Sequence, residues 1–289
     1  MEEKSSRKVA VISMDVEDWY HLDYFDKSRC DQEIKNSMLD GVSVFLKILE
    51  EHQIKATFFV VGEIVQSFRH VLLKIKEAGH EIASHTYSHQ RPLALSYSDF
   101  DKELKESKMI LESVIGGEVN GFRAPCFSMD RDCLERVRSA GYLYDSSRID
   151  FSHHPLYGSI DMDGFSADLK GHYYNDNFHE FEVSSLKIWN RSIPVSGGGY
   201  LRIFPWIVMK HLLKRYLKDA DFYVLYIHPF ELSERGCPPL PSTTSALSRQ
   251  RFNYGRASVP KKLSKLINLL GNSGFEFRTF RDFLGKTKA

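Results

Sequence analysis

The sequence predicts an α/β fold in which helices cover a parallel sheet that is either open or closed into a barrel. Short continuous apolar runs alternate with segments of helical spacing, and the first run ends in acidic residues. A short apolar run is typical of a strand buried on both faces, and strand–helix alternation favours parallel β-α units. No repeat, low-complexity tract or linker divides the 289 residues. We therefore expect one domain, residues 1–289.

The individual elements follow from this alternation. The expected strands are residues 9–15, 56–61, 81–83, 121–123 and 222–227. The expected helices are residues 42–52, 64–78, 100–115 and 206–217, and further short elements are expected at residues 134–140 and 142–145. Residues 146–200 interrupt the pattern as a loop-rich insertion that is expected to shape a binding site, and residues 240–289 form a C-terminal extension.

Composition excludes several classes of protein. A net charge of +1 predicts no overall attraction to nucleic acid or to an anionic membrane. The four cysteines, Cys30, Cys126, Cys133 and Cys237, form no Cys-x-x-Cys pair, so neither a disulfide framework nor a cysteine zinc site is expected. The first residues show no signal pattern, and no stretch approaches the roughly 18 apolar residues of a membrane span. The expected location is the cytoplasm, and the oligomeric state is left open.

The sharpest local motif is the pair His85 and His89 in the segment HTYSH. On a helical turn, residues four apart share one face and lie about 6 Å apart along the axis, so both imidazoles can bind one ion. Zinc and similar ions accept neutral imidazole, and a carboxylate from elsewhere would complete a three-ligand site with an open position for water. The alternative interpretation is a pair of surface histidines.

Polar residues follow three other expected strands. Asp15, Glu17 and Asp18 lie where the first strand ends, and carboxyl ends of parallel strands face the functional rim. Clustered carboxylates repel one another unless a cation neutralises them. His228 follows the strand 222–227, and Arg123 stands between Gly121 and Pro125, which fix the backbone around it. The alternatives are a solvated turn, a core histidine and a surface arginine.

These segments, in this order, resemble the polysaccharide deacetylase family, also called the NodB-homology domain or carbohydrate esterase family 4. The matching stretches are residues 13–18 (SMDVED), 84–89 (SHTYSH), 123–125 (RAP) and 225–228 (LYIH). Residues 196–202 (SGGGYLR), residues 227–231 (IHPFE) and the tail beyond residue 240 further resemble cytoplasmic deacetylases encoded with exopolysaccharide or lipopolysaccharide pathways.

The resemblance implies a distorted (β/α) barrel with fewer than eight regular strands. It also implies a metal-dependent hydrolase that removes an N-acetyl group from an amino sugar in a glycan or glycan precursor. His85 and His89 would bind a divalent metal, with zinc expected, Asp15 would be the base, and Arg123 would hold Asp15 ionised and oriented. His228 would protonate the leaving amine, and a backbone N–H near Tyr87 or Cys126 would bind the oxyanion.

Two departures from the family pattern leave roles open. Family members place a metal-binding aspartate where Val16 stands here, so either Glu17 or Asp18 must supply the carboxylate. Glu17 lies two residues from Asp15 and would share its face of the strand, whereas Asp18 has the more usual side chain. The acid that tunes the catalytic histidine is also missing after Asp145. Glu231 and Asp150 are the candidate substitutes.

The sequence leaves alternative interpretations of both the substrate and the reaction. Aromatic residues of the insertion and the segment after it are candidates for stacking on sugar rings or for packing in the core, namely Tyr157, Tyr173, Tyr174, Trp189, Tyr200 and Trp206. Tyr87, Cys126 and Tyr200 are the expected substrate-binding residues. The other interpretations are an allantoinase-like hydrolase of cyclic amides, a catalytically inactive carbohydrate-binding relative, and an iron oxygenase, which would leave Arg123 and His228 without a purpose.

Overall fold

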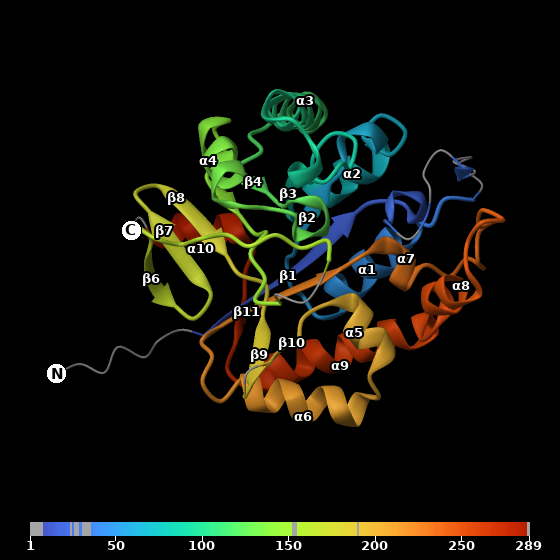
Figure 1. Ribbon diagram of the computed structural model, residues 1–289. Helices are drawn as coiled ribbons and strands as arrows, with labels where there is room; N and C mark the ends of the chain where they lie inside the picture. Colours follow the sequence, from blue (N-terminus) through green and yellow to red (C-terminus); the bar gives the residue numbers. More distant parts are fainter. Residues whose placement is uncertain are drawn as a thin grey trace.

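A curled sheet forms the centre of the structure (Figure 1), a computed structural model that describes residues 8–23, 25, 29–30, 36–151, 155–189 and 191–287. Across these residues the strand order is β11 (Phe222–Ile227), β1 (Val9–Val16), β2 (Thr57–Val60), β3 (Glu81–Ser84), β4 (Gly121–Phe122), β5 (Tyr144–Asp145), β8 (Phe178–Phe181), β7 (His172–Asn175) and β6 (Ser166–Leu169). A further strand, β12 (Glu276–Phe277), pairs with β1.

Neighbouring strands from β11 to β8 are all parallel, and the antiparallel strands β7 and β6 complete one edge. The fold is therefore the distorted (β/α) barrel with few regular strands that the sequence predicts. The helices are α1 (Gly41–Glu51), α2 (Arg69–Glu77), α3 (Tyr97–Ile115), α4 (Arg131–Ser139), α5 (Gly198–Ile203), α6 (Trp206–Tyr216), α7 (Pro229–Leu232), α8 (Ala246–Asn253), α9 (Val259–Asn272) and α10 (Phe280–Thr287).

The alternation of side chains along β1 separates two cores. Ala10, Ile12, Met14 and Val16 point to the outer core beneath the helices. Val9 and Val11 point into the barrel, where Phe280 and Phe283 of α10 pack against them in one cluster. Ser13 and Asp15 continue this inner face toward the carboxyl end of the strand. The barrel interior is therefore apolar at one end and polar at the other.

Most expected elements are confirmed. The predicted strands end within two residues of the observed ones, and α1, α3 and α6 begin and end within three residues of the predicted helices. The short elements expected at residues 134–140 and 142–145 are α4 and β5. The helix expected at residues 64–78 is shorter, because α2 begins at Arg69 and a 3-10 helix, Gly62–Ile64, precedes it. No helix of the described residues is long and apolar enough to span a membrane.

One structural prediction is wrong. Residues 85–89 are not helical, because the chain leaves β3 in a loop in which Thr86 and His89 have positive φ angles of 61° and 57°. The loop-rich insertion 146–200 also holds strands that the sequence pattern did not indicate, namely β6, β7 and β8 and the hairpin of β9 (Ser185–Ile188) and β10 (Arg191–Pro194). The C-terminal extension contributes α8, α9, β12 and α10, of which β12 and α10 belong to the barrel itself.

Candidate metal centre and catalytic pocket

The carboxyl end of β1 places two acidic side chains on the inner face of the barrel. Asp15 and Glu17 are both buried, at 3% exposure each. The N–H of Glu17 donates to the carbonyl oxygen of Asp15 over 3.0 Å, which turns the chain sharply at Val16. Val16 itself points to the outer core. The period of the strand and this turn explain why Glu17, and not the residue next to Asp15, stays at the site.

The loop after β3 brings His85 and His89 together without a helix. The hydroxyl of Thr86 donates to the carbonyl oxygen of His85 over 2.6 Å and accepts from the N–H of His89 over 3.1 Å. The carboxylate of Glu103 on α3 accepts from the N–H groups of Tyr87 and Ser88 over 2.8 Å each. The two imidazole rings then lie 5.1 Å apart between centroids. Convergence of the histidines was expected, and its geometric cause is this loop.

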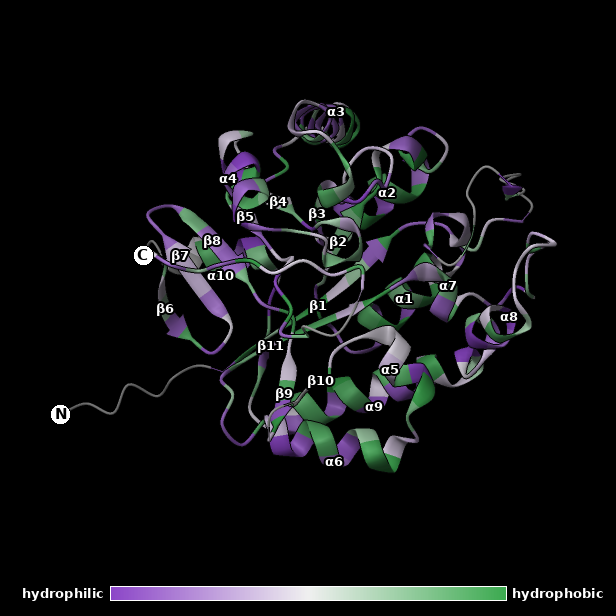
Figure 2. Cartoon of the chain, in the orientation of Figure 1, coloured by the Kyte–Doolittle hydropathy of each residue, from purple (hydrophilic) through white to green (hydrophobic). Residues whose placement is uncertain are grey.

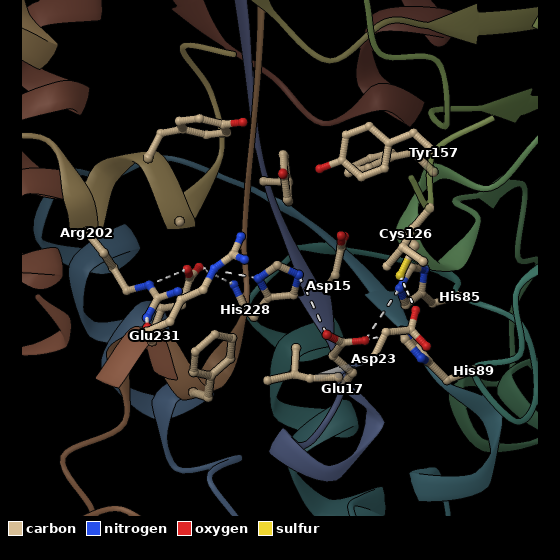
Figure 3. Close-up of a pocket in the computed structure, with 18 of the residues that line it drawn as sticks. Asp15, Glu17, Asp23, His85, His89, Cys126, Tyr157, Arg202, His228 and Glu231 are labelled. Carbon is tan, nitrogen blue, oxygen red and sulfur yellow. Dashed lines mark hydrogen bonds and ion pairs between the residues drawn. The ribbon is translucent and has the colours of Figure 1, made fainter. Parts of the chain in front are cut away.

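Glu17 and the two histidines form the group that can hold a metal ion. Ligand atoms of Glu17, His85 and His89 lie within 4.8 Å of one another. Oε2 of Glu17 is 3.9 Å from Nε2 of His85 and contacts Nε2 of His89 (Figure 3). This oxygen is buried and has no hydrogen-bond partner among the described residues. An orphaned buried carboxylate oxygen that faces two imidazole nitrogens fits a divalent cation.

The hydrogen bonds of His85 also suit metal binding. Its Nδ1 lies 2.7 Å from the carbonyl oxygen of Arg123, which only accepts, so Nδ1 carries the proton and the lone pair of Nε2 faces Glu17. Burial lowers the pKa of His85 to about 4, which keeps the ring neutral. Burial opposes ionisation of Glu17, but His89, with His228 and His85, lowers the pKa of its carboxyl well below the ordinary value. The group thus offers the neutral imidazole of His85, the imidazole of His89 and one carboxylate.

Asp18 is held away from this group. Its Oδ1 accepts from the N–H groups of Trp19 and Met38 over 2.8 Å each, so the carboxylate caps the short 3-10 helix Trp19–His21. Asp18 does not line the pocket that contains the two histidines. Of the two carboxylates that the sequence left open, the geometry favours Glu17, and the expectation for Asp18 is corrected to a helix cap.

Arg123 is fully buried and reaches across the barrel to Asp15. Its Nη1 donates to Oδ1 of Asp15 and to Oγ of Ser13 over 2.8 Å each, while Nε and Nη2 bond the carbonyl and hydroxyl oxygens of Ser146. Its guanidinium also stacks on the ring of Phe59 at 4.1 Å. Every one of these bonds fixes orientation, so Arg123 holds the Asp15 carboxylate in one place.

On the opposite wall, His228 belongs to a relay of charged groups. Nε2 of His228 lies 3.6 Å from Oε1 of Glu17, and its Nδ1 lies 3.3 Å from Oε2 of Glu231. The other oxygen of Glu231 accepts from Nε of Arg202 over 3.1 Å. Asp150, the other candidate partner, accepts from the hydroxyl of Ser192 instead. Glu231 is therefore the acid that contacts the histidine.

The electrostatics of this relay favour a protonated imidazole. Burial favours neutral His228, but the hydrogen bond to Glu231 and the charges of Glu17, Glu231 and Asp15 raise its pKa to about 9. Burial likewise opposes the charge on Glu231, whereas His228 and Arg202 lower its pKa. The protonated ring of His228 thus faces the carboxylates of Glu17 and Asp15.

The glycines of residues 197–199 explain how this relay is assembled. A Cβ on Gly198 would lie 1.7 Å from Oε2 of Glu231, and one on Gly197 would lie 2.8 Å from the hydroxyl of Tyr226. Only a residue without a side chain lets the start of α5 approach Glu231 so closely. Arg202 stands one turn later on α5 and reaches the same carboxylate. A role for Arg202 was not predicted from the sequence, and the signal that could have indicated it is the Gly-rich start of α5.

The acidic, histidine and arginine side chains of the site line one pocket with a volume of about 190 Å³ (Figure 3), namely Asp15, Glu17, His85, His89, Arg202, His228 and Glu231. Cys126 and Tyr200 lie on its wall, as expected, and Tyr157 of the insertion does too. Sγ of Cys126 donates to Asp23 over 2.7 Å, and Cys126 and Phe127 both have positive φ angles, which concentrates backbone strain at this rim. Asp23 and Arg251 also line the pocket and were not foreseen.

The remaining sequence candidates lie elsewhere. Tyr87 does not line the pocket and its N–H is bonded to Glu103, so the expectation that it binds the oxyanion is corrected. Tyr173 and Tyr174 belong to β7, and Trp189 is 92% exposed on the β9–β10 hairpin. Trp206 packs against the outer core. Cys126 therefore remains the candidate for the backbone donor.

The fold and this strand-end site define a class: distorted barrels of the NodB-homology type, with a carboxylate and two histidines at the carboxyl ends of the first and third strands. Residues 32–144 match the family model described as polysaccharide deacetylase, and residues 146–285 match a domain of unknown function, DUF3473. The first half of the chain is thus similar to the polysaccharide deacetylase family, carbohydrate esterase family 4.

Relatives agree with this assignment. The chain is 27% identical over 117 residues to a peptidoglycan deacetylase of Helicobacter pylori, and these residues are 40% of each of the two proteins. It spans less than half the length of the first named relatives it matches.

Two solved structures share the fold. A family 4 acetyl xylan esterase of Clostridium thermocellum in complex with a cobalt ion has a TM-score of 0.54 and 14% identity, with 97% of this chain and 92% of that chain covered. A CE4 family pseudoenzyme of Bacillus anthracis has a TM-score of 0.54 and 14% identity, with coverage of 96% and 66%.

Proposed function

We propose that the protein is a divalent-metal-dependent hydrolase that removes the acetyl group from an N-acetylated amino sugar. The single observation that carries this proposal is the convergence of Glu17, His85 and His89 in a pocket that also presents Asp15 and His228. The printed activity of the peptidoglycan deacetylase of Helicobacter pylori supports the N-acetyl substrate class. Zinc is the proposed ion, because two imidazoles and one carboxylate are a common catalytic zinc set.

Each side chain has a distinct role in this proposal. Glu17, His85 and His89 would hold the metal, which when bound supplies Lewis-acid activation of the amide carbonyl and of water. Asp15, fixed by Arg123, accepts the proton of the attacking water. His228 lies on the opposite wall and donates a proton to the leaving amine. The N–H of Cys126 is the proposed backbone donor to the oxyanion.

Glu231 and Arg202 position the acid rather than touch the substrate. The carboxylate of Glu231 bonds both the N–H and Nδ1 of His228, over 3.0 and 3.3 Å. These contacts direct Nε2 into the pocket and favour the protonated ring. Arg202, which also donates to the carbonyl oxygens of Arg251 and Phe252, fixes Glu231 in turn. This chain thus replaces the missing tuning acid after Asp145 with a residue three positions beyond the histidine.

The pocket walls favour a single sugar ring. The volume of about 190 Å³ and the tyrosines at positions 157 and 200 suit one amino sugar that stacks on an aromatic face. The test is acetate release from N-acetylglucosamine oligomers and peptidoglycan fragments by the protein loaded with zinc or cobalt, beside release of ring-opened product from a cyclic amide. Full metal occupancy without turnover of any of these substrates would contradict the hydrolase proposal.

A further inference from the structure

One stretch of the second half of the chain lacks acidic residues. The sequence contains 38 Asp and Glu, yet residues 183–218 include none. The same stretch contains seven basic residues, namely Lys187, Arg191, Arg202, Lys210, Lys214, Arg215 and Lys218. A protein with a net charge of +1 therefore concentrates positive charge in one segment. Asp219 is the first acid that follows it.

The helix α6 displays most of this charge to solvent. Met209, Leu213 and Tyr216 pack on the outer core and define its buried side. The basic side chains on α6 and directly after it are exposed, and none of them forms an ion pair with a described residue: Lys210, Lys214, Arg215 and Lys218. Among the residues that the structure describes, these four cations have no ion-pair partner.

Apolar side chains adjoin this charge on the side of the pocket. Ile203, at the end of α5, is 47% exposed, and Ile207 and Val208, in the first turn of α6, are 78% and 41% exposed. Figure 2 shows hydrophobic colour along α6 interrupted by hydrophilic residues. Ile203 also lines the catalytic pocket, so the apolar part of this surface begins at the pocket rim. We call these residues, with the four exposed cations, the α5–α6 surface.

We propose that the α5–α6 surface docks the protein on an anionic lipid membrane. Exposed aliphatic side chains beside unpaired Lys and Arg are the composition of helices that lie in the plane of a membrane interface. The cations are attracted to anionic headgroups, and Ile203, Ile207 and Val208 lose water when they enter the interface. An anionic polysaccharide would pair with the cations but would leave these aliphatic side chains exposed to water. A lipid surface accounts for both the cations and the aliphatic side chains.

This geometry sets the pocket beside the headgroups. Because Ile203 belongs to both the pocket wall and the α5–α6 surface, a docked protein presents its pocket mouth at the membrane. An amino sugar attached to a lipid would be brought to the site in this way. That consequence rests on the proposed function, whereas docking itself does not.

The test measures binding without turnover. The full-length protein is sedimented with vesicles of phosphatidylcholine alone or with about one-third phosphatidylglycerol, at low and at raised salt. We expect binding to the anionic vesicles that weakens with salt, and a blue shift in Trp fluorescence from Trp206 at the start of α6. The double variants Ile207→Ser/Val208→Ser and Lys214→Glu/Arg215→Glu should each weaken binding about tenfold or more.

The control is a matched pair of changes on another exposed helix face. Lys105→Glu/Met109→Ser alters one cation and one apolar residue, 58% exposed in the case of Met109, on α3, and should leave vesicle binding unchanged. Absence of binding to anionic vesicles, equal binding by all variants, or binding only to a soluble anionic polysaccharide would overturn the proposal. Because no substrate is present, failure here and failure of the deacetylase proposal can be told apart.

Discussion

Oε1 of Glu231 lies 3.1 Å from Nε of Arg202, in a pair with 1% and 3% side-chain exposure. The pair fixes the carboxylate whose other oxygen contacts His228. It joins α5 to α7, two elements of the second half of the chain, and supports the histidine that directly follows β11 of the barrel. The reactivity proposed for the first half of the chain thus depends on contacts supplied by the second.

Replacing Glu231 by Gln should shift the pH dependence of turnover. Although burial lowers it, the pKa of His228 is raised to about 9, and Glu231 is a main cause. Without that charge the folded-state pKa falls, so the protonated acid is lost at lower pH. We expect the alkaline limb of kcat to move toward neutral pH in Glu231→Gln, measured on the metal-loaded protein.

Asp150→Asn is the matched control for that experiment, because Asp150 bonds Ser192 rather than His228. Its pH profile should coincide with that of the wild type. An unchanged alkaline limb in Glu231→Gln would show that another group tunes the histidine.

Glu17→Gln and Asp18→Asn should separate metal binding from helix capping. Glu17→Gln removes the charge next to His85 and His89 and should lower metal affinity by at least about tenfold. Asp18→Asn should keep the metal and change the free energy of unfolding little, because the amide oxygen of Asn can still accept from the N–H groups of Trp19 and Met38. Metal content after dialysis and thermal unfolding report the two effects. Metal loss only in Asp18→Asn would reverse the assignment.

Asp15→Asn should abolish turnover while the metal stays bound. The amide keeps the shape of the carboxylate beside Arg123 but cannot accept a proton from water, so kcat should fall about 10²–10⁴-fold. The measurement pairs acetate release with bound metal per chain. Retention of near wild-type kcat would remove Asp15 from its role as base.

Two adjacent glycines of α5 should respond in opposite ways to alanine. In Gly198→Ala the new Cβ would lie 1.7 Å from Oε2 of Glu231, so the carboxylate or the helix must move, and the melting temperature should fall. In Gly199→Ala no atom lies within 4 Å of the new Cβ, and alanine gains up to about 1 kcal/mol in a helix. Equal melting temperatures for the two variants would contradict the close approach of α5 to Glu231.

His80 should make stability fall in mild acid. Burial, with the charge of Lys55, lowers the pKa of His80 to about 4 from 6.5. Below pH 6.5 the unfolded chain binds a proton that the folded protein does not, so the contribution of His80 is lost as the pH falls from 6.5 toward 4. At pH 5 this amounts to about 1–2 kcal/mol.

His80→Asn is the control, because Asn can accept the hydrogen bond that Nδ1 receives from the N–H of Ala56 and does not titrate. Denaturant unfolding at pH 7 and pH 5 gives the comparison. Parallel stability curves for the two proteins would exclude His80 as the cause.

Local sequence patterns were enough to predict the main barrel strands and the residues at their carboxyl ends. Apolar runs such as β1 and β11 are buried on both faces whatever their neighbours, so Asp15 and His228 could be placed at one rim from local pattern alone. The ordered motifs added Arg123, His85 and His89. The prediction of a helical turn at residues 85–89 was wrong because the hydrogen bonds that shape the loop come partly from Glu103, on a helix further along the chain.

The preference for Glu17 over Asp18 as a metal ligand, and for Glu231 over Asp150 as the partner of His228, comes from the packing of the folded chain alone. In each pair both residues lie near the motif in sequence, and the choice depends on which carboxylate the packing aims at the histidines. The overall composition also gave no indication of the positive charge on α6, since the net charge of +1 predicted no attraction to a membrane. Folding exposes the cations of α6 beside Ile207 on one surface, because the opposite side of the helix is buried in the core. Long-range packing, which no local pattern encodes, fixed these choices.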